Sequence, residues 1–145
     1  MLTWSIVGDT KHLPDAGVAS VTIFLAILRT LVGLVFVVAG AAKLFQHDVF
    51  AANFARWNVP EPGIAVLVVG ALEIVCGGLF ALGALTRPVG MLLATIMIAA
   101  AYFAGRVDPF PHLIVTSILF VLTVFFAWRS GRVPGRTPAR RPGVQ

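Results

Sequence analysis

The chain has 145 residues, of which 59% are hydrophobic and only 12% are charged, and its formal net charge is +5. Its mean hydropathy of +0.95 lies outside the range of ordinary soluble domains. A soluble all-α protein would need a polar face on each helix, and the long apolar runs have almost none. The composition therefore favours an integral membrane protein over a soluble one.

Four apolar runs approach the roughly 20 residues that cross a hydrocarbon core. They predict an all-α fold, a four-helix transmembrane bundle within residues 18–128. The expected helices are 18–44, 63–85, 88–104 and 113–128. The first run could instead be a signal peptide that ends near residues 39–41. We interpret it as a retained helix, because it is longer than a signal core of roughly 7 to 15 residues and contains Arg29.

Residues 1–17 form a polar leader that is too short for a domain, and we expect it to be loosely ordered in the cytoplasm. One face of the first span then combines small residues with two cations. This stripe, with spacings of 4, 3, 4 and 3, is Arg29, Gly33, Phe36, Gly40 and Lys43. Its glycines allow another helix to approach closely.

The segment after the first span has an aromatic helical face. Phe50, Phe54 and Trp57 recur at i, i+4 and i+7 after Asp48, a candidate N-cap. The pattern predicts a short helix that lies flat at the outer interface and is ended by the prolines within residues 60–62. Simple interfacial anchoring, without a ligand role, explains the same aromatic residues.

The second span carries a matching stripe around Glu73. This stripe is Gly70, Glu73, Gly77, Phe80 and Ala84. Arg29 lies 11 residues and Glu73 lies 10 residues into antiparallel spans, so both are expected near the midplane, where a charge costs about 2.5 to 3.5 kcal/mol. We therefore predict a buried Arg29–Glu73 ion pair with two parallel hydrogen bonds. Its desolvation cost suggests a use beyond packing.

The remaining spans are joined by short connections. Thr86 is a candidate N-cap and Pro88 suits the first helical turn, which predicts a tight antiparallel hairpin of the second and third spans. Residues 105–111 connect the third and fourth spans. Residues 129–145 hold prolines among arginines without apolar periodicity, which predicts a disordered basic cytoplasmic tail that is attracted to anionic lipid.

The basic residues cluster beside the spans, which indicates orientation in a membrane and not nucleic-acid binding. With four spans, both termini share a side. That side holds Lys11, Arg87, Arg129, Arg132, Arg136, Arg140 and Arg141, and the opposite side holds Lys43, Arg56 and Arg106. The positive-inside rule then predicts that both termini lie in the cytoplasm.

Histidine and cysteine residues give little evidence of a metal site. His47 and His112 are expected on the outer side near acidic residues, where a metal or haem site is conceivable. Two histidines on separate loops are weak evidence, so we interpret them as interfacial polar residues and expect no metal. Cys76 is the lone cysteine and is interpreted as a small packing residue.

The spaced residues of the first two spans and the connection after them resemble the DoxX family of small four-helix bacterial membrane proteins. The resemblance spans about residues 25 to 105. It rests on Arg29 and Phe36, Gly40-x-x-Lys43-Leu44, Glu73-x-x-x-Gly77-Gly78 and Leu82-Gly83-x-x-Thr86-Arg87. By position, Arg29, Lys43, Glu73 and Arg87 match the charged residues of the family. The resemblance implies a bundle in the bacterial cell membrane. Relatives include a quinone-reducing subunit of archaeal thiosulfate oxidation and actinobacterial proteins associated with thiol and oxidative-stress enzymes.

The function we expect is that of a quinone-facing membrane subunit of an oxidoreductase or redox-stress complex. The predicted site has Arg29 and Glu73 as its catalytic residues and Lys43, Arg87, Phe36 and Phe80 around the quinone. No covalently bound cofactor is expected, so a redox partner protein or soluble donor would supply electrons.

Two other classes of function stay open. A noncatalytic scaffold or assembly factor would use the ion pair to fix helix register. A small-solute carrier is less favoured, because transporters usually contain more spans, although a homo-oligomer would evade that objection.

Overall fold

The computed structural model describes residues 16–107 and 109–130, which hold five helices. They are α1 (Ala16–Phe45), α2 (His47–Arg56), α3 (Pro62–Leu82), α4 (Thr86–Ala104) and α5 (Pro109–Ser130). In this part of the chain four helices are long and apolar enough to cross a membrane, and α2 is the short one. The predicted all-α, four-span fold is therefore confirmed. The leader before residue 16 and the tail after residue 130 lie outside the described residues.

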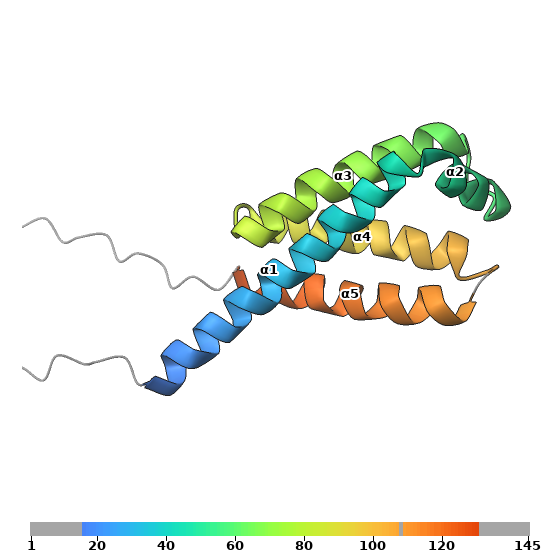
Figure 1. Cartoon of the computed structure of the whole chain (residues 1–145). Helices are drawn as coiled ribbons and strands as arrows, with labels where there is room; N and C mark the ends of the chain where they lie inside the picture. The colour runs from blue at the N-terminus through green and yellow to red at the C-terminus, as the bar shows by residue number, and fades with distance from the viewer. Residues whose placement is uncertain (1–15, 108, 131–145) are drawn as a thin grey trace, which may run out of the picture.

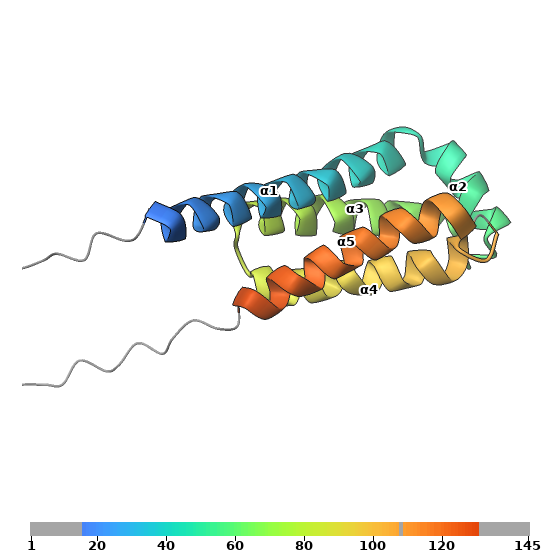
Figure 2. The ribbon, with the colours of Figure 1, turned by 90° about the horizontal axis from the view of Figure 1, so that it is seen from below.

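The four long helices form two antiparallel pairs, α1 with α3 and α4 with α5 (Figures 1 and 2). A short turn joins α3 to α4, whereas α1 and α5 touch each other little. The start of α1 and the end of α5 lie at one end of the bundle, which we call the terminal end. The short helix α2 and the α4–α5 connection lie at the other, which we call the α2 end.

Helix α1 is longer than the rest of the bundle. Its 30 residues correspond to about 45 Å at about 1.5 Å per residue, and a hydrocarbon core is about 30 Å thick. The 21 residues of α3 correspond to about 32 Å. The first turns of α1 therefore extend past the terminal end of α3, as Figure 1 shows.

Glycines bring α1 and α3 into close contact. A Cβ atom on Gly40 would lie 2.5 Å from the carbonyl oxygen of Gly70, and one on Gly77 would lie 2.7 Å from that of Gly33. Only a residue without a side chain fits at such distances. The two stripes predicted from the sequence therefore do face each other.

The core lies between the two helix pairs. Its buried apolar residues are Val32, Phe36, Cys76, Phe80, Val89, Leu93, Met97 and Phe126. The ring of Phe80 packs edge-on against that of Phe126, with 6.0 Å between the ring centroids. Cys76 is part of this core and is buried without a disulfide.

The turn between α3 and α4 differs from the prediction. Helix α3 ends at Leu82 because Gly83 adopts a left-handed conformation with φ of 78°, which glycine tolerates best. Leu85, not Thr86, occupies the N-cap of α4, and the Thr86 hydroxyl donates a hydrogen bond to the Gly83 carbonyl over 3.1 Å. Pro88 lies in the first turn, as predicted.

The ends of α2 also differ from the prediction. The N-cap position is held by Gln46 without a side-chain hydrogen bond, so Asp48 lies in the first turn and is not the cap. The helix ends at Arg56, before the prolines. Pro62 opens α3 and does not terminate α2, which agrees with the preference of proline for the first helical turn.

Candidate functional site

The buried carboxylate Glu73 is paired with Lys43. The Lys43 Nζ donates a hydrogen bond to Glu73 Oε2 over 2.6 Å, and only 4% of the Glu73 side chain and 14% of the Lys43 side chain are exposed. A charge-assisted hydrogen bond of this length offsets part of the cost of burying both ions. The predicted Arg29–Glu73 pair is wrong, and Lys43 takes the place assigned to Arg29.

Arg29 lies at the terminal end of the bundle, against the α3–α4 turn. Its Nη2 is 3.5 Å from the carbonyl oxygen of Ala81, and a Cβ on Gly83 would lie 2.6 Å from its Nη1. Gly83 follows Glu73 by ten residues, which is about 15 Å along a helix. Arg29 and Glu73 are therefore at different depths.

The register of α1 on α3 explains the wrong pairing. Counting residues from the starts of the apolar runs treats the two helices as equal in length, but α1 extends past the end of α3. The register is set by the glycine contacts, Gly33 with Gly77 and Gly40 with Gly70. A Cβ on Gly40 would also lie 3.0 Å from the Cβ of Glu73, so Glu73 packs beside Gly40. Lys43 is three residues from Gly40, about one helical turn, whereas Arg29 is eleven residues away.

The Lys43–Glu73 pair lines a cavity of about 340 Å³ at the α2 end of the bundle. All the helices of the described chain contribute to its mostly apolar wall. Helix α1 contributes Phe36 and α3 contributes Val69, beside the two charged residues. The ion pair is thus the charged part of an otherwise apolar chamber.

Helix α2 covers this chamber with its aromatic face. Phe50, Phe54 and Trp57 all line the cavity, and the Phe54 and Trp57 ring centroids are 5.5 Å apart. The Lys43 Nζ lies 5.6 Å from the centroid of the Phe50 ring, within the range of a cation–π contact. The predicted aromatic face exists, and it is directed at the ion pair and the cavity.

The far wall comes from α4 and α5, whose residues the sequence did not single out. These lining residues are Ile96, Met97, Ala99, Ala100, Phe103, Ala104, Val115, Thr116 and Leu119. The one feature of the sequence that indicates this wall is the run of small residues in α4, which leaves room between α4 and the pair of α1 and α3. Val35 of α1 and Val115 of α5 also line the cavity and are 48% and 56% exposed, so the chamber opens sideways between α1 and α5.

The other residues of the predicted site lie elsewhere. Phe80 is fully buried in the core beside Phe126, and Arg87 is exposed at the start of α4. Neither lines this cavity. Of the predicted residues the structure therefore brings together Phe36, Lys43 and Glu73, and it separates them from Arg29, Phe80 and Arg87.

His47 connects the start of α2 to the start of α3. Its Nε2 is 3.0 Å from the Gly63 carbonyl oxygen and its Nδ1 is 3.3 Å from Asp48 Oδ1. The Gly63 hydrogen bond, followed by that of Asp48, raises the pKa of His47 above its ordinary 6.5. Among the described residues no three His, Cys, Asp or Glu side chains are grouped so as to hold a metal ion.

Four membrane-spanning helices around an apolar chamber with one ion pair define a small multi-pass membrane protein. The chain belongs to the DoxX family, whose model matches residues 24–106, more than half of the chain. It is 38% identical over 74 residues to an uncharacterized membrane protein of Mycobacterium tuberculosis. That match covers 50% of this chain and 45% of the relative, so it spans about half the length of each protein. No solved structure matches the chain.

Proposed function

We propose that this protein is the quinone-facing membrane subunit of an oxidoreductase or redox-stress complex, and that a quinone ring binds in the cavity beside Lys43 and Glu73. The observation that carries the proposal is the buried ion pair in the wall of an apolar chamber. Small-molecule sites combine apolar walls with a few placed polar groups. An ion pair inside a membrane is costly, so its presence beside a cavity favours a ligand.

The size and the opening of the chamber suit a ring on a lipid tail. Ligand pockets measure about 300 to 1,000 Å³, and a cavity of about 340 Å³ is large enough for a head group but small for a whole isoprenoid chain. The sideways opening between α1 and α5 would leave the tail among lipid chains. The rings of Phe50 and Trp57 offer faces for stacking on a quinone.

The charged residues have distinct roles in this proposal. Reduction of a quinone to a quinol consumes two electrons and two protons, and the electrons would come from a partner protein or a soluble donor. The Lys43 ammonium group would donate a hydrogen bond to a ring oxygen. The Glu73 carboxylate would accept a proton and pass it on. The surrounding apolar side chains would exclude water from both groups.

A cavity-filling variant tests the proposal. Ala100 lines the chamber on α4, and Ala100→Phe places a ring inside it. Ala71 is exposed on α3 and does not line it, so Ala71→Phe is the matched control. Purified protein in lipid nanodiscs should bind a short-tailed naphthoquinone, and Ala100→Phe should weaken binding at least about tenfold, with no change in the control. No binding by the parent, or equal loss in both variants, would contradict the proposal.

A noncatalytic scaffold is the second candidate, because the same ion pair joins α1 to α3. The two functions differ in what Glu73→Gln changes. For a quinone subunit, this variant should lower partner-dependent quinone reduction while the partner remains bound. For a scaffold, it should lower the stability of the bundle or partner recovery and leave the partner's activity unchanged.

A further inference from the structure

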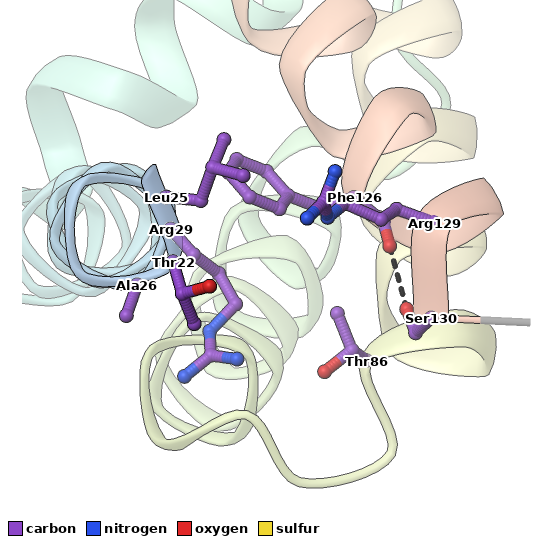
Figure 3. A pocket seen from close by; sticks show the side chains of 8 residues that line it. All are labelled: Thr22, Leu25, Ala26, Arg29, Thr86, Phe126, Arg129 and Ser130. Carbon is purple, nitrogen blue, oxygen red and sulfur yellow. Dashed lines mark hydrogen bonds between the residues drawn. The ribbon is translucent and has the colours of Figure 1, made fainter. Parts of the chain in front are cut away.

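A second cavity lies at the terminal end of the bundle, between α1, α5 and the start of α4. It measures about 260 Å³ and contains two arginines, Arg29 of α1 and Arg129 of α5 (Figure 3). The rest of its wall consists of three apolar residues and three residues with hydroxyl groups: Leu25, Ala26, Phe126, Thr22, Thr86 and Ser130. We call it the arginine pocket. It is separate from the chamber of the Lys43–Glu73 pair, which has none of these residues in its wall.

The charge of the arginine pocket is not balanced by described carboxylates. The acidic residues that the structure describes are Asp48 on α2, Glu61 before α3 and Glu73, which Lys43 neutralises. None of the three lines the pocket. Two guanidinium groups therefore share a cavity without a described counterion.

The guanidinium group of Arg29 is fixed by packing and has N–H donors without a partner among the described residues. Its guanidinium group packs on Gly83, where a Cβ would clash, so the left-handed glycine that ends α3 also makes room for the arginine. Its one hydrogen bond within the described chain is the long contact of 3.5 Å to the Ala81 carbonyl, and its Nε is shielded from solvent without a partner. A guanidinium group has five N–H donors, so most of them are available.

Two of the three hydroxyl groups in the wall of the pocket donate hydrogen bonds to backbone carbonyl groups. Thr86 donates to the Gly83 carbonyl, and Ser130 donates to the Phe126 carbonyl. In Figure 3 the Arg29 side chain extends from α1 toward the α3–α4 turn, and the Arg129 side chain extends from α5 toward α1. The charged donors of the pocket are the two guanidinium groups, whose planar forks match the oxygens of a phosphate.

We propose that the arginine pocket binds a phosphate group. The pocket lies where α5 ends and where α3 turns into α4, which is the depth of lipid head groups for helices of this length. Arg29 and Arg129 would hold the phosphate oxygens between them. The phosphate can belong to an anionic phospholipid or to a soluble phosphate, and the experiment distinguishes these two sources.

The test compares three arginines of the same end of the protein. Arg29→Gln and Arg129→Gln each remove one charge from the pocket, and Arg87→Gln removes one charge from an exposed side chain outside it. Binding of phosphatidylglycerol to the full-length protein in detergent is measured by native mass spectrometry, with phosphatidylcholine as the competing lipid. Each pocket variant should bind phosphatidylglycerol about tenfold more weakly, the usual loss for a charge-assisted hydrogen bond, and Arg87→Gln should change it less than about twofold.

Titration of delipidated protein with inorganic phosphate is the second arm, with thermal stabilisation as the readout. In one outcome, inorganic phosphate stabilises the protein through both pocket arginines while phosphatidylglycerol is not selectively retained. That result supports the proposal, with a soluble phosphate as the source. Equal losses in all three variants would overturn it, since they would indicate general surface attraction. Undiminished binding of both probes in Arg129→Gln would also overturn it. Arg129 is exposed, so the Arg129→Gln variant should fold. Arg29→Lys keeps the charge and removes the planar guanidinium group, so it tests whether binding needs that group as well as the charge.

Discussion

Lys43 of α1 and Glu73 of α3 form an ion pair of 2.6 Å inside a membrane-spanning bundle, and both side chains are largely shielded from their surroundings. Neither charge has a second ionic partner among the described residues. Each ion therefore depends on the other for compensation, and the pair is also the charged part of the wall of the chamber.

This dependence predicts the effect of removing one ion. Lys43→Met leaves the Glu73 carboxylate buried without its partner and should destabilise the protein by about 3 to 5 kcal/mol. The double variant Lys43→Met/Glu73→Leu removes both charges and should recover most of that loss, because apolar replacements of buried pairs pack well. Reversible unfolding in detergent measures both. A single variant as stable as the parent would contradict the mutual compensation of the two charges.

Two adjacent glycines of α3 test the packing of α1 on α3. A Cβ on Gly77 would meet the Gly33 carbonyl oxygen at 2.7 Å, whereas a Cβ on Gly78 would meet nothing within 4 Å. Gly77→Ala should therefore destabilise the bundle by about 1 to 3 kcal/mol. Gly78→Ala should be neutral or stabilising by up to about 1 kcal/mol, since alanine favours the helix. Unfolding curves that rank the two variants equally would contradict the observed register.

His47 predicts a pH dependence in the attachment of α2 to α3. Its folded-state pKa is raised, chiefly by the Gly63 carbonyl, so the stabilisation is complete below about pH 6.5 and is lost as the pH rises through the folded-state pKa. The melting temperature should therefore fall modestly from pH 6 to pH 8, and the His47→Gln variant should remove this part of the fall. A histidine titration by NMR that places the pKa of His47 below 6.5 would count against this account.

The orientation in the membrane is also testable. The terminal end carries Arg29, Arg87 and Arg129, and the tail that follows adds four arginines, so we predict that this end faces the cytoplasm. In a Cys76→Ala background, Val107→Cys at the α2 end should react in intact cells with a thiol reagent that cannot cross membranes. Ala84→Cys at the terminal end should react after lysis only. The reverse pattern would mean the opposite orientation.

The helices and their contact faces could be predicted from the sequence. Apolar length gives the four spans, and the spacing of small residues gives the facing stripes of α1 and α3. Predicting the partner of Glu73 requires the register of α1 against α3. The lengths of the apolar runs do not give this register when one helix extends past the other. Pairing Gly33 with Gly77 and Gly40 with Gly70 in antiparallel helices places Glu73 opposite Val37. Lys43 is then six residues away and Arg29 eight, so the glycine spacing favours Lys43 only slightly.

The cavity itself could not be predicted in the same way. Its walls combine residues of helices that are distant in sequence, and it exists because α1 and α5 do not close on each other. The aromatic face of α2 was visible as a helical pattern, but a lipid interface and a cavity both suit such a face. Which of the two it meets depends on how α2 folds back over the bundle.

Photoaffinity labelling with an azidoquinone tests the central proposal most directly. The label should attach to residues of the chamber, and the expected positions are Phe54 of α2, Trp57 directly after it and Phe103 of α4. Ala100→Phe should abolish the labelling, and Ala71→Phe should not. Peptide mass spectrometry locates the label. Labelling spread over the lipid-facing surfaces of α1 and α5, or labelling of the chamber that Ala100→Phe leaves unchanged, would contradict quinone binding beside Lys43 and Glu73.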